Sequence, residues 1–175
     1  TATTNSNVGS YDVTASGLTA DNYDITFVKG TLNINSKALT ITVNNSTKVY
    51  GTPNPSFSVA YEGFVLGQDH NALSGSLVYT TVATDDSNVG SYDVTASGLS
   101  STNYAITFVK GTLTITQAEQ VINVTNVTKE FTYNGSAHTI SGATAQGAIT
   151  YSPATVTTAG KHTITISAAE TTNYK

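Results

Sequence analysis

Short runs of alternating hydrophobic and polar residues occur along most of this chain. In residues 38–43, Leu39, Ile41 and Val43 fall on one side of an extended backbone and two threonines fall on the other. Because successive side chains of a strand point to opposite faces, this period of two predicts a strand with one face buried and one in water. Further strands are predicted over residues 48–50, 57–61, 76–82, 92–96 and 105–115.

In residues 105–115, the apolar side chains change from one face of the predicted strand to the other near the middle. Ile106 and Phe108 share one face before Gly111, whereas Leu113 and Ile115 would lie on the opposite face if the strand continued unbroken. A bulge or a tight bend returns all four side chains to one face, and glycine in a strand often marks such a place. We therefore predict an interruption of the strand at Gly111.

Residues 63–75 (GFVLGQDHNALSG) show no alternation. Asp69 can cap a short helical turn that runs through Leu73, with Gly75 just beyond it. The segment is therefore predicted to be a single helical turn or a compact loop. Short strands with frequent turn residues predict an all-β fold of small antiparallel β-sandwich or β-grasp-like modules, with at most one short helical turn per module.

The chain contains an internal repeat. Residues 7–18 (NVGSYDVTASGL) return unchanged as residues 88–99, at an offset of 81 positions, and residues 22–32 return as residues 103–113 with one difference. A fixed period is the signature of an array of modules. It places the C-terminal half of a preceding repeat at 1–36, one complete repeat at 37–116, and a related repeat of a different subtype at 117–175.

The third repeat is recognised by weaker matches. Residues 121–135 loosely parallel residues 38–51, and residues 159–174 parallel residues 89–104. This second match places His162 where the middle repeat has Tyr92. No equivalent of the run AITFVKGTLTI follows, so the third repeat is predicted to lack its last strand, and the chain is expected to be a window from a longer array or a unit of a filament.

Composition excludes several classes of protein. The chain has no cysteine, which rules out disulfides and thiolate metal sites. With seven Lys and Arg and a net charge of -4, it has no basic stripe that would bind nucleic acid. No apolar run approaches the length of a membrane span, so membrane insertion of this segment is not expected. The abundant threonines fit the water-facing side of strands.

No arrangement of residues points to catalysis. His70, His138 and His162 fall in different predicted elements, without metalloprotease spacing, and no serine sits in a G-x-S-x-G turn. The chain is therefore not expected to be an enzyme. His70 and His138 are expected in solvated positions, and His162 at the margin of a buried face.

One turn offers oxygen ligands for a cation. Asp85 and Asp86 lie beside Ser and Asn in residues 84–88 (TDDSN), the type of ligand that Ca²⁺ prefers. The equivalent residues 3–7 (TTNSN) lack both acids, which favours a solvated turn. Apart from this candidate Ca²⁺ site, no cofactor is expected.

Two lysines recur in the repeated segments and raise the question of a covalent cross-link. An intramolecular Lys–Asn isopeptide bond needs a buried lysine, and the recurring Lys29 and Lys110 each precede a glycine at a bend, which disfavours such a bond.

Tyrosine side chains are candidates for glycan binding, because their rings can stack on sugars. Most tyrosines are expected inside the modules, which leaves Tyr50 and Tyr79 as candidate surface positions. The inward group comprises Tyr11, Tyr61 and Tyr92 on apolar faces, with Tyr23 and Tyr104 closing the module ends.

The middle repeat resembles a known family. Its step Val49-Tyr50-Gly51, its run GSYDVTASG (residues 90–98) and its run FVKGTLTI (residues 108–115) are similar to the MBG domain of the YGX type. The resemblance covers the middle repeat and the N-terminal fragment, and residues 117–175 only as a related subtype. It implies a tandem module of large bacterial surface proteins and adhesins, and it supplies no catalytic residues.

The resemblance and the repeat together predict the function. We expect a non-catalytic repeat module of a bacterial extracellular surface protein, located at the cell surface, that acts as a stalk or spacer and in adhesion, with neighbouring repeats of the same chain as partners. One alternative is a binding module for host glycan, mucin or host protein. Another is a filament subunit that self-associates by strand exchange, in which residues 22–35 complete residues 118–175 of a neighbour.

Overall fold

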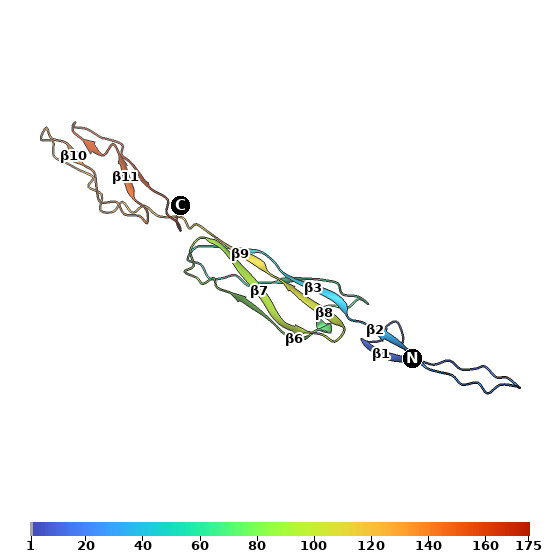
Figure 1. Ribbon diagram of the computed structural model, residues 1–175. Coiled ribbons are helices and arrows are strands. Elements are labelled where there is room, and N and C mark those ends of the chain that lie inside the picture. Colours follow the sequence, from blue (N-terminus) through green and yellow to red (C-terminus); the bar gives the residue numbers. More distant parts are fainter. Residues whose placement is uncertain (1) are drawn as a thin grey trace. The chain divides into compact units, whose positions relative to one another are not determined.

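The computed structural model describes residues 2–175, and its regular secondary structure consists of strands apart from one short 3₁₀ turn (Figure 1). The chain forms two compact units. The first contains the residues up to Asn44 together with 57–81 and 93–112, and the second contains 45–56, 82–92 and 113–175. The all-β fold class predicted from alternation is confirmed.

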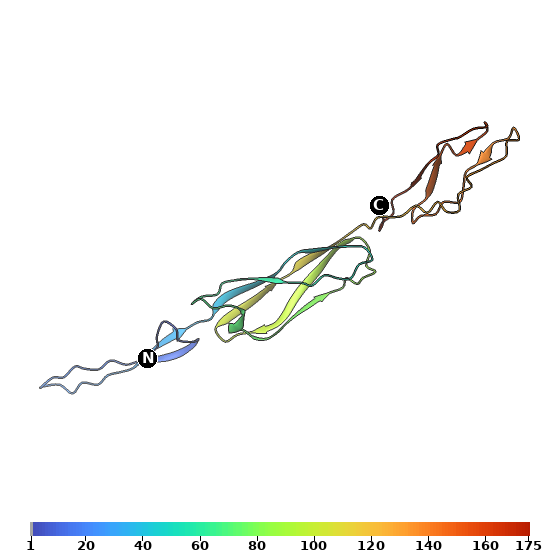
Figure 2. The same cartoon turned by 180° about the vertical axis from the view of Figure 1, so that it is seen from behind.

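The first unit begins with a hairpin. Strand β1 (Gly9–Val13) pairs antiparallel with β2 (Gly30–Ile34), and residues 14–29 between them carry no strand (Figure 2). Val13 is 54% exposed and Leu32 is 46% exposed, so this hairpin leaves apolar side chains in water.

A three-stranded sheet provides the core of the first unit. Strand β3 (Lys37–Val43) lies between β5 (Val59–Glu62), its antiparallel partner, and β8 (Tyr104–Val109), its parallel partner. Leu39 and Ile41 of β3 are fully buried together with Tyr104. The predicted inward face of residues 38–43 is therefore confirmed. Partly buried side chains around this cluster include Val59, Tyr61, Phe64, Leu73, Leu99, Ile106 and Phe108.

The predicted helical turn is also present. A 3₁₀ turn, η1 (His70–Ala72), follows Asp69, whose side chain accepts a hydrogen bond from the Asn71 N–H at 2.9 Å, and it ends at Leu73. The Asp69 carboxylate thus satisfies a backbone donor that the short turn leaves free.

A second sheet has the order β4-β9-β7-β6, formed by β4 (Ser46–Val49), β9 (Gly111–Thr116), β7 (Gly90–Ser100) and β6 (Ser74–Thr81). Strand β8 ends before Lys110 and β9 begins at Gly111, which confirms the predicted interruption. A Cβ at Gly111 would clash with the carbonyl oxygen of Val43, so the close approach requires glycine. Leu113 and Ile115 are then buried, with exposures of 0% and 1%.

Residues 117–175 form two small sheets. Strand β10 (His138–Thr139) pairs with β12 (Thr155–Val156), and β11 (Ile149–Ser152) pairs with β13 (Thr165–Ala168), both antiparallel. The β11–β13 pairing repeats β6–β7, because Tyr151 opposite Ile166 matches Tyr79 opposite Ala96.

Two of the strand pairings are parallel, a detail that the expected antiparallel β-sandwich or β-grasp-like modules left unspecified. Strand β8 runs parallel to β3, with Phe108 beside Ile41, and β9 runs parallel to β4, with Ile115 beside Lys48. Alternation specifies which face of a strand is buried but not the direction of its neighbour. Parallel partners must be joined by a long connection, and here strands β4 to β7 lie between β3 and β8 in the sequence.

Candidate functional site

The same hydrogen bonds occur at two places in the chain, each between segments that the sequence analysis assigns to consecutive repeats. The Asn103 side chain accepts a hydrogen bond from the Val8 N–H at 2.9 Å, and its Nδ2 donates to Asn7 Oδ1 at 2.8 Å. In the third repeat, Asn173 accepts from the Val89 N–H at 2.9 Å and donates to Asn88 Oδ1 at 2.9 Å. We call each set the asparagine clasp. The side chain of one repeat binds the turn that precedes the GSYDV or equivalent strand of the repeat before it.

The local chain holds each clasp asparagine in place. Before Asn103, the Ser101 hydroxyl oxygen accepts from the N–H groups of Asn103 and Tyr104 at 3.1 and 3.2 Å. The Asn103 carbonyl accepts from the Lys37 N–H at 2.9 Å, so the residue also binds the chain that enters the repeat. The Ala118 N–H donates to the Asn173 carbonyl in the same way, at 2.9 Å.

The turn on the other side of the clasp is also conserved between the two copies. The Tyr11 hydroxyl donates to the Asn7 carbonyl at 2.8 Å, and the Tyr92 hydroxyl donates to the Asn88 carbonyl at 2.8 Å. In the third repeat, His162 Nε2 lies 2.8 Å from the Thr158 carbonyl oxygen. His162 thus contacts a carbonyl four residues earlier, as Tyr92 does. The expectation that His162 lies at the margin of a buried face was wrong, because its side chain is exposed.

The turn that carries Asp85 and Asp86 has the geometry of its acid-free copy. The Thr84 N–H donates to Ser87 Oγ at 2.8 Å, and the equivalent bond in residues 3–6 is also 2.8 Å long. Asp85 Oδ1 accepts from the Asn54 N–H at 3.3 Å. Within residues 2–175, no three His, Asp or Glu side chains converge on a common point. Ca²⁺ binding at this turn stays a prediction from the sequence.

The histidines have different surroundings. His70 is exposed and stacks on Tyr61, with ring centroids 6.2 Å apart. The expectation of a solvated His138 was wrong, because its ring is half-buried and stacks on Phe131 at 4.7 Å. Its Nε2 is buried, and no hydrogen-bond partner is found for it in the part of the chain that the structure describes.

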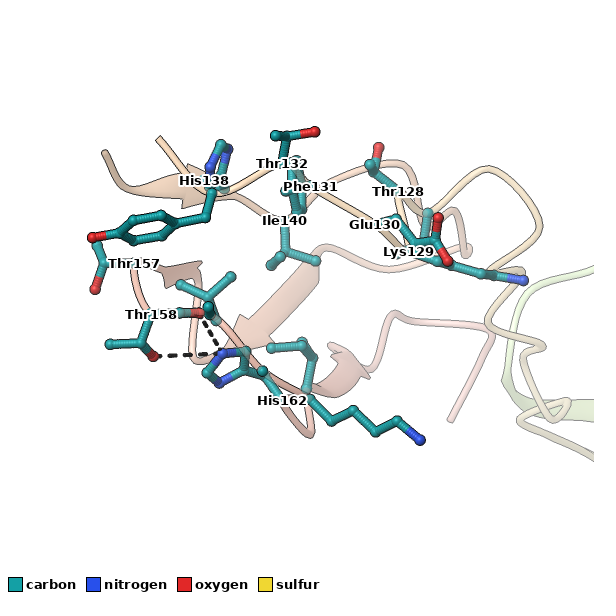
Figure 3. Close-up of a pocket in the computed structure, with 17 residues that line it drawn as sticks. Thr128, Lys129, Glu130, Phe131, Thr132, His138, Ile140, Thr157, Thr158 and His162 are labelled. Carbon is teal, nitrogen blue, oxygen red and sulfur yellow. Dashed lines mark hydrogen bonds between the residues drawn. The ribbon is translucent and has the colours of Figure 1, made fainter. Parts of the chain in front are cut away.

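His138 and His162 line one open groove in the third repeat (Figure 3). The groove encloses a volume of about 1100 Å³. Its walls come from residues 127–133 on one side and from residues 156–162 and Ile164 on the other, with Phe131 and Ile140 among its apolar side chains. The sequence analysis did not identify this groove, because its walls come from segments that are separate in the chain.

Two recurring lysines are exposed, whereas Lys48 is buried. Lys29 and Lys110 are exposed and form ion pairs with Asp12 and Asp93 at 2.9 and 2.7 Å, so neither has the burial that an isopeptide bond needs. Lys48 is only 6% exposed. Its ammonium donates to the carbonyl oxygens of Thr52 and Thr84 at 2.9 and 2.7 Å.

The two tyrosines proposed as surface positions are each partly covered by another ring. Tyr50 meets Tyr174 edge to face at 5.5 Å, and Tyr79 lies 5.9 Å from Phe57. Burial raises the pKa of Tyr79 above its ordinary value of 10.0, and the nearby Tyr61 raises it further.

Tyr104 is buried at the end of its module, as expected, whereas Tyr23 is exposed. Tyr104 is 4% exposed, and its hydroxyl donates to Gln68 Oε1 at 2.5 Å. Tyr23 has the same place in the repeat and is 79% exposed. Nothing in residues 2–36 provides the segment that covers Tyr104 in the middle repeat. Tyr133, at 66% exposure, is another open aromatic side chain that sequence reasoning missed.

Comparison with known proteins gives one match. The model of the family described as MBG domain (YGX type) matches residues 1–33 and 39–114. No curated protein and no solved structure matches the chain. No helix within residues 2–175 has the length and hydrophobicity needed to cross a membrane.

Proposed function

Because the chain belongs to the MBG domain family of the YGX type, we propose that it is a non-catalytic stalk or spacer segment of a bacterial extracellular surface protein. The family is one of repeat modules of surface proteins and is not a known enzyme family. The role proposed for this chain is to extend the array and so hold another part of the protein away from the cell surface.

The asparagine clasp is the observation that supports this proposal. A spacer must connect its modules by contacts that every repeat can supply to the next. The clasp does this twice with the same atoms, between Asn103 and residues 7–8 and between Asn173 and residues 88–89. In repeat arrays, such contacts between neighbours add to the stability of each module.

Small-angle X-ray scattering of the full chain tests the proposal. A compact globular protein of this length would have a radius of gyration of about 16 Å. A spacer should give a value well above that, and the double variant N103A/N173A should broaden the distribution of dimensions. Asn22 has the equivalent place in the N-terminal copy, so N22A is the matched control and should leave the scattering unchanged. A compact radius for the parent chain would contradict the stalk role.

Exposed aromatic side chains support a second role in adhesion. Tyr133 is 66% exposed, and aromatic faces are common platforms for sugars. A glycan array that includes mucin glycans should then show saturable binding by the chain, and Y133A should reduce it. If the chain binds no glycan reproducibly, that result contradicts the adhesive role, and the spacer role is the one that remains.

A further inference from the structure

The chain enters the middle repeat in β3 and leaves it from β9, and each of these strands has a parallel partner. The β3–β8 ladder begins with Lys37 beside Tyr104 and ends with Thr42 beside Val109. The chain arrives at the Lys37 end of this ladder, and β8 continues towards β9 from the Val109 end. A pull on the chain from both sides of the repeat therefore acts on opposite ends of the ladder.

The β4–β9 ladder has the same arrangement. It begins with Ser46 beside Leu113 and ends with Val49 beside Thr116. Strand β4 is reached from β3 at the Ser46 end, and the chain leaves the repeat from Thr116 at the other end. One more hydrogen bond follows β4, because the Tyr50 N–H donates to the Thr116 carbonyl at 2.8 Å. The exit strand is thus bonded up to its last residue.

The entry and exit strands also carry buried apolar side chains. Leu39 and Ile41 of β3, and Leu113 and Ile115 of β9, are at most 1% exposed. Close-packed side chains leave little room for small displacements. A strand that slides along its neighbour must therefore move these side chains out of their packed positions while its hydrogen bonds break.

The antiparallel pair β6–β7 responds differently to a pull on its open end. Ser74 at the start of β6 lies beside Ser100 at the end of β7, and the pairing runs inward to Thr81 beside Val94. A pull on the Ser74 end of both strands opens the pair residue by residue, because only the outermost hydrogen bonds resist it. In a ladder pulled from opposite ends, the bonds are stretched together and must fail together.

We propose that the middle repeat is a tension-bearing module, in which the β3–β8 and β4–β9 ladders resist force in shear. The inference deepens the proposed spacer function and depends on it only for the source of the tension. Resistance to force is governed by the rate of unfolding rather than by the free energy of unfolding at rest. A module with this strand order keeps its folded length while the chain on either side of it is pulled.

Optical tweezers measure this resistance in the full chain, because the absence of cysteine lets handles be attached at chosen positions. The variant S36C/V121C is pulled across the middle repeat, and S74C/T102C is pulled across the open end of β6–β7; all four residues are exposed. At equal loading rate, the unfolding force of S36C/V121C should be about twofold or more higher, because its parallel bonds share the load. Its length gain should correspond to residues 37–116 at about 3.3–3.6 Å per residue, less the folded length.

Urea denaturation should give every variant the midpoint of the parent chain, because each substitution replaces an exposed residue. The pairs N35C/V121C and S76C/T102C load the same two ends and make the comparison independent of a single site; Asn35 and Ser76 are also exposed. Equal forces in the two geometries would overturn the proposal, as would a gradual extension across the middle repeat without one cooperative event.

The scattering experiment separates this inference from the spacer function. A chain that is extended in solution but gives equal forces in the two geometries would retain the spacer function and reject the tension-bearing module. A compact chain with the higher force across the middle repeat would reject the spacer function and retain the mechanical resistance of the fold.

Discussion

The Nδ2 of Asn103 donates a hydrogen bond of 2.8 Å to the Oδ1 of Asn7, a residue 96 positions earlier in the chain. Asn173 and Asn88 form the same bond at 2.9 Å across 85 positions. Each clasp side chain also accepts a backbone N–H, that of Val8 or Val89. Asn103 and Asn173, each followed by a tyrosine, therefore both contact a turn of sequence Asn-Val-Gly far earlier in the chain.

Replacing Asn103 with Ala should loosen this contact without unfolding the repeat. The substitution removes two hydrogen bonds, and each is worth about 1 kcal/mol. Hydrogen exchange of the Val8 amide should accelerate, because that N–H loses its acceptor. N22A is the matched control, since Asn22 is exposed and no bond of its side chain is found within residues 2–175. Unchanged exchange at Val8 in N103A would show that the clasp is not formed in solution.

Val94 and Val13 have the same place in the repeat and opposite environments, at 0% and 54% exposure. Val94→Ala should lower the free energy of unfolding by about 2 kcal/mol, from lost hydrophobic burial and the cavity that remains. Val13→Ala should change it by less than about 0.5 kcal/mol, as most surface substitutions do. Urea denaturation of both variants measures the difference. Comparable losses would mean that the N-terminal hairpin has a packed core of its own.

Lys48 should contribute to stability through its ammonium group. Lys48→Met keeps the apolar stem but leaves the carbonyl oxygens of Thr52 and Thr84 without their donor. The expected loss is about 2 kcal/mol, which is typical for hydrogen bonds to a charged group. Lys129→Met is the control, because it makes the same substitution at a lysine whose side chain is exposed. Thermal unfolding of the two variants tests this difference, and a K48M protein as stable as its parent would contradict the role.

Tyr79 should make stability fall at alkaline pH. Its pKa is raised above 10.0 by burial in the folded chain, so the neutral hydroxyl is favoured there relative to the unfolded chain. This stabilisation is complete below pH 10 and is lost as the pH rises through the folded pKa. Denaturation at a series of pH values above 10 should show a decline that is smaller in Y79F. An identical decline in both proteins would contradict the prediction.

Local patterns predicted much of the middle repeat. Alternation identified the buried face of Leu39 and Ile41, the parity change located the break at Gly111, and Asp69 marked the start of η1. These features depend on residues close together in the chain, so their physical causes are visible in short windows. The clasp, in contrast, depends on partners 85 and 96 positions apart, and only the repeat of Asn-Tyr and Asn-Val-Gly hinted at it.

The candidate sites show the same division. The match of His162 with Tyr92 was read from spacing alone, because both side chains bond a carbonyl four residues earlier. The half-buried state of His138 was missed, since the groove around it arises from segments that the chain brings together.

The sequence by itself determined the all-β class, the 81-residue repeat, the buried face of residues 38–43 and the family of the chain, because these depend on local periodicity and on residue identity. Only the tertiary structure decided strand direction, the asparagine clasp and the degree of burial. Tyr104 is 4% exposed and Tyr23 is 79% exposed, although both follow Asn in the same repeated motif. The physical reason is that burial depends on the segments that pack against a residue, and the middle repeat supplies residues 64–68 over Tyr104 while residues 2–36 supply no counterpart.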